Sequence, residues 1–220
     1  MLRVESVENN HSRRTQMSVI IYNRVIPIVG KNDLVANRMQ TIAGIFNRLG
    51  AKTRLSKIAM GAFAGQYALQ AAYDDCTSAM AAFEELQADS EYLELMKQRE
   101  NNPGAEVVGP SMFRTIYNDV DALQEKVQLV RIYNVPRKNI PAVIELMGEV
   151  DSLSDDVNLL GVLPVASQDM SLCAAIYRFN SLSHLGRSFD GVGTSEEFLR
   201  LVEKANTLGT LSAANINISL

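Results

Sequence analysis

An internal repeat is the sequence feature that most constrains the fold. The chain of 220 residues carries the order β-α-β-β-α-β twice, judged from β-branched runs and from apolar residues at helical spacing. The first copy is expected to have strands over 18–29, 52–60, 66–73 and 105–117, with helical regions over 33–49 and 76–99. The second copy is expected to have strands over 127–135, 157–165, 170–179 and 209–219, with helical regions over 138–152 and 181–206. This self-similarity predicts a duplicated unit of about 100 residues.

Short residue matches accompany the repeated pattern. The tripeptide Ile-Tyr-Asn occurs at 21–23 and again at 132–134, an offset of 132 − 21 = 111. Tyr73 closes the third strand of the first copy, and Tyr177 occupies the same place in the second. Each match is weak, but their shared order along the chain favours duplication.

The repeat also predicts how the chain is divided. Residues 1–16 are polar and are expected to form a disordered tail. The two ferredoxin-like halves are expected over 17–117 and 127–220, joined by a polar linker over 118–126. We refer to them below as the first and second half.

A unit of this kind forms an antiparallel sheet with both helices on one face, so its other face needs a partner. The sheet of the other half is the nearest one, either in the same chain or in a second chain of a homodimer. In the strand over 157–165 both faces are largely apolar, with Leu159 and Leu163 on one and Leu160 and Val162 on the other. We therefore expect the sheets to meet across a dry apolar layer, and we assign Leu159 and Leu163 to it.

The β-α-β-β-α-β order, its repetition and the broken second helix resemble the dimeric α+β barrel superfamily, in which two ferredoxin-like units pack sheet against sheet. The resemblance covers about residues 17–220 and implies an α+β fold with two tandem ferredoxin-like units in one barrel. It also implies a range of functions, since the superfamily includes cofactor-independent monooxygenases, small isomerases and lyases, haem-degrading enzymes, chlorite dismutase-like haem proteins and ligand binders. Fold alone does not choose among them.

Composition narrows the partners. The net charge of −4 does not favour nucleic acid or an anionic membrane surface as a partner, since both call for clustered Lys and Arg. No apolar run approaches the roughly 20 residues of a membrane span. Cys76 and Cys173 form no CxxC pair and cannot build a metal site alone, so we expect buried thiols in a reducing, cytoplasmic compartment. No metal or cofactor is expected.

Tyrosines and asparagines on the first and third strands are candidate ligand-binding residues. Neighbouring residues of a strand point to opposite faces, so one member of each Tyr-Asn pair faces the helices. The hydroxyl and amide groups could then line a pocket between sheet and helices. The alternative is that the tyrosines fill a half-buried sheet and place their hydroxyls at its rim. The candidates are Tyr22, Asn23, Tyr73, Tyr133, Asn134 and Tyr177.

His184 completes the candidate set. It lies at the start of the second half's second helical region, and His11 is the only other histidine. The chain resembles the dimeric α+β barrel superfamily, and in the haem-binding branch of that superfamily a helix histidine of the second half ligates iron. Two other roles remain open for His184: a surface histidine near the start of a helix, or a general base.

Three functions follow as hypotheses. The first is a small-molecule binding protein or a cofactor-independent enzyme of the monooxygenase or isomerase type. The second is an oligomerisation module without enzymatic activity, and the third is a haem-binding protein that uses His184.

Overall fold

The computed structural model describes residues 17–119 and 125–220, so the predicted tail and the middle of the predicted linker lie outside the described residues. The first half contains β1 (Val19–Pro27), α1 (Asn32–Arg48), β2 (Lys52–Gly61), β3 (Tyr67–Tyr73), α2 (Cys76–Ala88), α3 (Ser90–Asn101) and β4 (Ala105–Tyr117). The second half contains β5 (Val127–Asn134), α4 (Ile140–Asp151), β6 (Asn158–Ala166), β7 (Leu172–Phe179), α5 (Leu182–Asp190), α6 (Glu196–Leu208) and β8 (Thr210–Ser219). The order agrees with the sequence prediction, and the element bounds agree to within two residues.

The strands form one closed antiparallel barrel in the order β1-β3-β2-β8-β5-β7-β6-β4. Strands of the first half are neighbours as β4-β1-β3-β2, and those of the second half as β8-β5-β7-β6. The two sets join where β2 pairs with β8 and where β4 pairs with β6. Gly61 lies at the first of these seams, where a Cβ atom would come within 2.0 Å of the Ala214 carbonyl oxygen. The barrel closes within one chain, so no second chain is needed to complete it.

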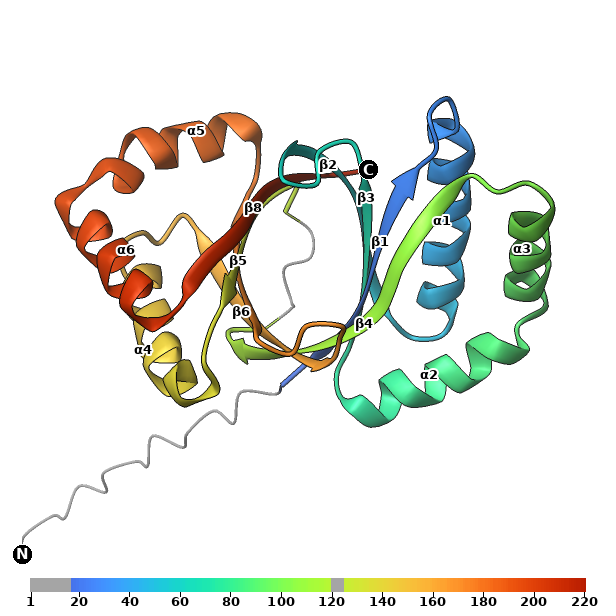
Figure 1. Cartoon of the computed structure of the whole chain (residues 1–220), viewed down its shortest axis with the longest axis horizontal. Helices are drawn as coiled ribbons and strands as arrows, with labels where there is room; N and C mark the ends of the chain where they lie inside the picture. The colour runs from blue at the N-terminus through green and yellow to red at the C-terminus, as the bar shows by residue number, and fades with distance from the viewer. Residues whose placement is uncertain (1–16, 120–124) are drawn as a thin grey trace, which may run out of the picture.

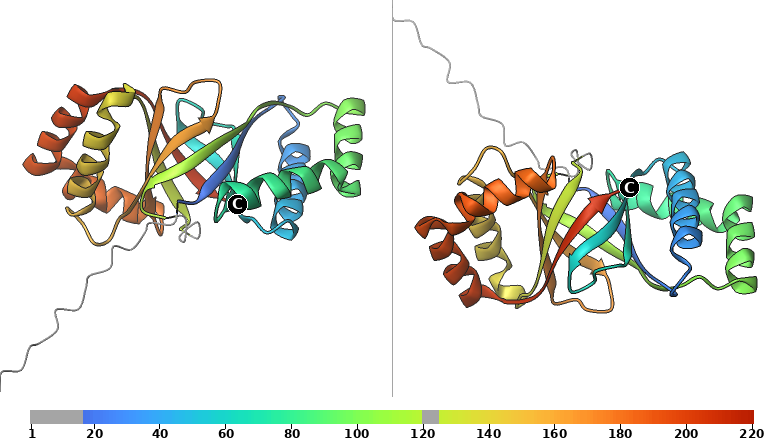
Figure 2. Two further views of the ribbon diagram at one scale, coloured as in Figure 1. Left: turned by 90° about the horizontal axis from the view of Figure 1, so that it is seen from below. Right: turned by 90° about the horizontal axis from the view of Figure 1, so that it is seen from above.

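The helices cover the outside of the barrel on two opposite sides (Figures 1 and 2). Both second helical regions are broken at a polar cap. The Asp89 carboxylate accepts a hydrogen bond from the Tyr92 backbone N–H at 2.8 Å and starts α3, and the Ser195 hydroxyl accepts from the Phe198 N–H at 3.2 Å and starts α6. None of the helices in the described ranges is long and apolar enough to cross a membrane.

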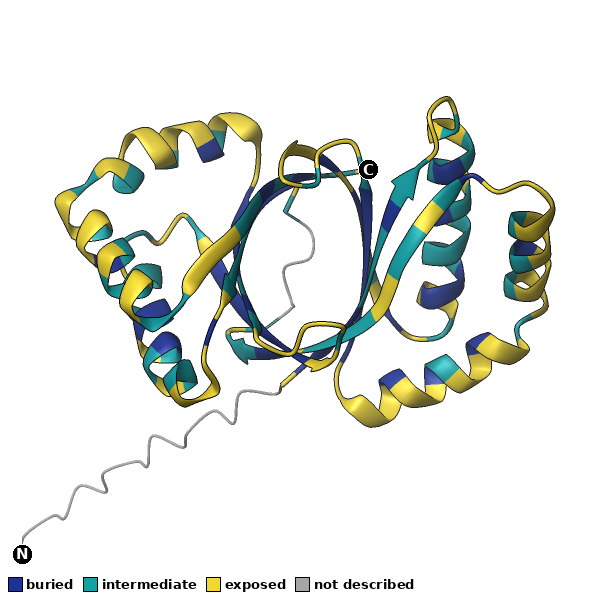
Figure 3. Cartoon of the chain, viewed as in Figure 1, coloured by how far each residue is buried: buried dark blue, intermediate teal, exposed yellow. Residues whose placement is uncertain are grey.

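The barrel interior combines an apolar cluster with buried polar side chains, so the expected dry apolar layer is only partly correct. Figure 3 shows that burial differs among the strands: β3 is buried along its length, while β4 and β8 carry mostly intermediate and exposed residues. The apolar cluster contains Ile20, Ala72, Leu160, Val162 and Ile176, with Phe113, Val130 and Ala174 packed against it. Polar side chains on the strands that share this interior include Arg54, Gln70, Gln128 and Arg178, all at most 5% exposed. The Gln70 amide donates to the Gln128 carbonyl oxygen at 3.4 Å, between strands that are not neighbours, so this bond crosses the interior.

The assignment of Leu159 and Leu163 to the interior is wrong. Both pack with Met147 of α4 on the helix side of β6, whereas Leu160 and Val162 face inward. Helices and the opposite sheet both demand apolar residues, so alternation alone could not tell these faces apart. The expectation for the cysteines is half correct, since Cys173 is buried and Cys76 is exposed at the start of α2.

Candidate functional site

A cavity of about 580 Å³ lies between the outer face of the first half's strands and helices α1, α2 and α3. Its volume falls in the range of about 300–1,000 Å³ that small-molecule sites occupy. Most of the wall is apolar. The wall residues of this kind include Val25, Val35, Met39, Ile42, Phe46, Leu69, Phe83, Leu86, Met96 and Val107.

Polar side chains enter this first-half cavity at a few places only. Asn23 contributes an amide from β1, and Tyr92 and Arg99 contribute from α3. Arg38 projects from α1 and donates from its terminal nitrogens to the carbonyl oxygens of Asn102 at 2.9 Å and Gln98 at 3.1 Å. The guanidinium of Arg38 thereby satisfies carbonyls at the C-terminal end of α3, where a helix has no partners of its own.

The two guanidinium groups at the cavity have no carboxylate partner within residues 17–119 and 125–220. The Nε of Arg38 is buried without a hydrogen-bond acceptor among these residues. Arg99 donates to the Met96 sulfur at 3.2 Å, a weak acceptor. Glu100 also lines the cavity, but it is exposed. The α3 end of the cavity therefore carries a local excess of positive charge.

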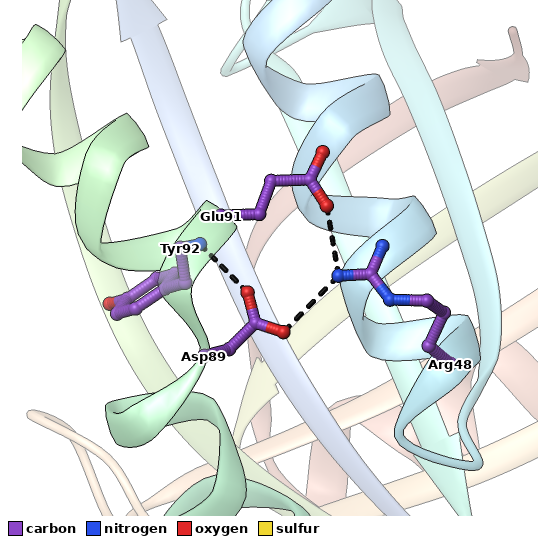
Figure 4. A network of polar contacts seen from close by, with 4 residues as sticks. All are labelled: Arg48, Asp89, Glu91 and Tyr92. Atoms are coloured by element: carbon purple, nitrogen blue, oxygen red, sulfur yellow. Dashed lines mark hydrogen bonds and ion pairs between the residues drawn. The ribbon is translucent and has the colours of Figure 1, made fainter.

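A polar network outside the cavity fixes the helix that carries Tyr92 (Figure 4). Arg48, at the end of α1, contacts the carboxylates of Asp89 at 3.2 Å and Glu91 at 2.8 Å. The hydrogen bond from the Tyr92 N–H holds the pKa of Asp89 below its ordinary value, and Arg48 acts in the same direction. The charged cap and its arginine join the start of α3 to α1, so the cavity wall formed by α3 has a defined position.

The corresponding space in the second half is almost filled. Two cavities of about 50 and 60 Å³ lie there, and Arg131, Tyr177 and Phe198 line both. The guanidinium carbon of Arg131 lies 5.6 Å from the ring centres of Tyr177 and of Phe198, within the range of cation–π contacts. Arg131 and the two rings thus occupy space that is open in the first half.

The strand ladders show which residues correspond between the halves. Val19 pairs with the last residue of β3 and Val127 with the last residue of β7, an offset of 127 − 19 = 108. Asn23 and Arg131 each lie four residues further along and occupy equivalent positions. The offset of 111 suggested by the Ile-Tyr-Asn tripeptide is therefore wrong. A shift of three residues also moves each side chain to the opposite face.

Two of the predicted site residues of the first half lie outside its cavity, and only Asn23 lines it. Tyr22 points into the barrel, where its ring packs edge to face with Phe113 at 6.2 Å. Tyr73 is buried among residues that pack against the helices, and its hydroxyl has no hydrogen-bond partner within the described residues. Burial raises the pKa of both tyrosines to about 12. Both fit the structural role that the sequence left open for them.

The structure brings together two of the predicted residues of the second half. Tyr133 lines the cavity of about 60 Å³, and Tyr177 lines both small cavities. Burial raises the pKa of Tyr177 to about 12, with nearby Arg131 opposing the shift. Asn134 is exposed at the end of β5, where its side-chain oxygen accepts from the Ser171 hydroxyl at 3.3 Å.

His184 lies apart from the tyrosines, in a hollow of about 420 Å³ lined mainly by polar residues of α5 and nearby loops. Its Nδ1 accepts from the Asn180 backbone N–H at 3.3 Å, and its ring meets Phe179 edge to face at 5.4 Å. A haem would need a wide apolar slot beside this histidine. The apolar cavities of this half measure only about 50 and 60 Å³, so the residues present do not fit haem.

We therefore expect no stoichiometric haem binding. Haemin titrated into the protein should give no saturable, shifted Soret band at a ratio of one haem to one chain. Such a band in the wild-type protein, together with its loss in His184→Ala, would contradict this expectation and make His184 an iron ligand.

No group of three or more His, Cys, Asp or Glu side chains that could hold a metal ion occurs within the described part of the chain.

Sequence reasoning missed the cationic part of the first-half cavity. Arg38 recurs at helical spacing with Leu34, Val35 and Ile42 on the face of α1 that is otherwise apolar. A cationic residue on the apolar, core-facing side of a helix needs buried partners, so Arg38 was the signal in the sequence for a polar site beside α1. Arg99 and Arg131 carried no comparable signal, because their surroundings depend on elements distant in sequence.

No family model matches the chain, and no curated protein matches its sequence. Among solved structures, a proposed monooxygenase from Fusobacterium nucleatum subsp. nucleatum is 7% identical and superposes with a TM-score of 0.63, covering 92% of each chain. An anthrone oxidase-like protein is 7% identical with a TM-score of 0.60, covering 94% of this chain and 92% of its own.

A mutant chlorite dismutase from Candidatus Nitrospira defluvii is 8% identical with a TM-score of 0.53, covering 94% of this chain and 92% of its own. At such low identity, these likenesses show the fold alone. The chain has the α+β barrel architecture of these monooxygenase-type and chlorite dismutase proteins.

Proposed function

We propose that the protein binds an apolar small molecule in the first-half cavity. The observation that carries this proposal is a space of about 580 Å³ with a largely apolar wall, whereas the equivalent space in the second half holds only two cavities of about 50 and 60 Å³. Burial of an apolar ligand against such a wall is favourable at about 25 cal/mol per Å² before the cost of association.

The enzymatic form of this proposal is a monooxygenase-type reaction without a bound cofactor. The names of two structural neighbours, a proposed monooxygenase and an anthrone oxidase-like protein, support it by analogy of fold. Asn23 is the polar side chain that β1 presents to the cavity, so it is the group we assign to hydrogen-bond an oxygen of the substrate.

Filling the cavity should remove binding. The neutral fluorophore N-phenyl-1-naphthylamine should bind the wild-type protein saturably at one site. Ile42→Trp combined with Val107→Trp, from opposite walls, should weaken this binding at least about tenfold, because the added rings occupy the ligand volume. The measurement is a fluorescence titration. The natural chain has no tryptophan, so the emission maximum of the variant reports whether the new rings are buried.

A matched double variant places the same rings outside the cavity. Leu93 and Leu199 are 52% and 51% exposed, and Leu93→Trp with Leu199→Trp should leave the titration unchanged. Absence of saturable binding to the wild-type protein, or equal affinity in the two double variants, would refute the proposed site.

We also propose a division of the chain into two repeated units, an oligomeric state and a cellular location. The strand order of each half supports two tandem ferredoxin-like units, with first-half and second-half bounds at 17–117 and 127–220. A homodimer and a cytoplasmic location stay predictions from the sequence. The oligomerisation module is the weaker alternative, because an assembly role does not require the first-half cavity.

A further inference from the structure

We infer that the ligand of the first-half cavity is amphipathic, with an apolar body and one anionic group that binds at Arg99. This inference rests on the proposed function, and it adds the charge and orientation of the ligand. It starts from the contrast between the apolar wall and the cationic groups at its α3 end.

Arg99 is placed to receive an anion. It is half-buried in the last turn of α3, and its only hydrogen-bond acceptor within the described residues is the Met96 sulfur at 3.2 Å. A guanidinium carries five N–H donors, so most of those of Arg99, which lines the cavity, are not engaged by this contact. Carboxylate, sulfonate and phenolate oxygens are the acceptors that a guanidinium binds most strongly.

Arg38 strengthens the same preference. Its terminal nitrogens are engaged by the carbonyl oxygens of α3, while its Nε–H stays buried without an acceptor among the described residues. A buried donor of this kind is costly unless it is satisfied. Arg38 therefore adds a positive charge to the same cavity, held at the end of α3 by its bonds to the Gln98 and Asn102 carbonyl oxygens.

The negative charge of Glu100 does not cancel the positive charge of Arg99 and Arg38. Glu100 lines the cavity but is exposed to solvent, and it forms no ion pair with Arg99 or Arg38 within the described residues. Solvent screens an exposed carboxylate more strongly than the half-buried guanidinium groups. The ligand thus enters with its anionic end at the end of α3 and its apolar body toward the sheet.

Two probes that share a ring system but differ in charge test this inference. One is N-phenyl-1-naphthylamine, and the other is 1-anilinonaphthalene-8-sulfonate, which adds a sulfonate. The measured quantity is the ratio of their dissociation constants. Arg99→Gln should reduce this ratio about tenfold in the direction that disfavours the sulfonate, the lower end of the effect of one charged hydrogen bond. Both probes share the ring system, so an effect of the substitution on the cavity wall divides out of the ratio.

Two further variants act as controls. Lys97→Gln removes a positive charge from an exposed position of the same helix that does not line the cavity, and it should leave the ratio unchanged. Arg99→Lys should retain part of the advantage of the sulfonate, because the charge remains while the fork of donors is lost. A ratio unaffected by Arg99→Gln, with the neutral probe still bound, overturns the anionic ligand alone. Failure of the neutral probe to bind the wild-type protein overturns the proposed function as well.

Discussion

Val162→Asp should destabilise the protein by about 3 kcal/mol or more, because it places a carboxylate among the apolar side chains of the interior cluster. Val162 is 4% exposed and packs in the interior cluster with Ile20 and Ala72. Its strand neighbours, Ala174 on β7 and Thr115 on β4, offer no positive charge. The measurement is chemical unfolding of the wild-type and variant proteins, compared by their free energies of unfolding.

Val165→Asp is the matched control. Val165 lies three residues further along β6 and is 41% exposed, so the same substitution should change the free energy of unfolding by no more than about 0.5 kcal/mol. Equal stability of the two variants would mean that the interior of the barrel is hydrated, and the described packing of its apolar cluster would be incorrect.

The fold could be predicted because it depends on local patterns that agree with one another. Apolar residues at periods of two and 3.6 residues predicted the order of strands and helices. Repetition of that order implied two sheets, each with an apolar face that the other sheet can cover. The faces of the strands were harder to assign. β6 is apolar on both sides, and only the three-dimensional structure shows that Leu159 meets α4 while Val162 meets the opposite strands.

The candidate site was predicted poorly because a cavity depends on what neighbouring side chains leave empty. Residue type pointed to tyrosines, yet Tyr22 faces the barrel and Tyr73 packs in the core. Asn23 was found, but its importance comes from its small size at a position where the second half has Arg131. That comparison requires the strand register, which the misleading tripeptide obscured by three residues.

The equivalence of Asn23 and Arg131 gives a reciprocal experiment. Arg131→Asn should open the second half, because the side chain that it removes lines both small cavities there. Removal of the guanidinium also ends its contacts with Tyr177 and Phe198, which frees both rings to move. We expect the stoichiometry of N-phenyl-1-naphthylamine to rise from about one to about two per chain.

Asn23→Arg should have the opposite effect and close the first-half cavity. Phe198 follows the cap of α6 as Tyr92 follows the cap of α3, so an arginine at position 23 would find an aromatic ring in an equivalent place. Binding of the neutral probe should weaken at least about tenfold in this variant, and the double swap should bind one probe, in the second half. Fluorescence titration measures all three variants.

The contradicting outcome is that Arg131→Asn still binds a single probe while Asn23→Arg binds as the wild type does. The side chains at the equivalent positions 23 and 131 would then not control the space between sheet and helices. The difference between the halves would then have to come from the packing of α1–α3 and α4–α6. Loss of binding in Asn23→Arg with a gain in Arg131→Asn would instead assign the asymmetry of the barrel to one residue in each half.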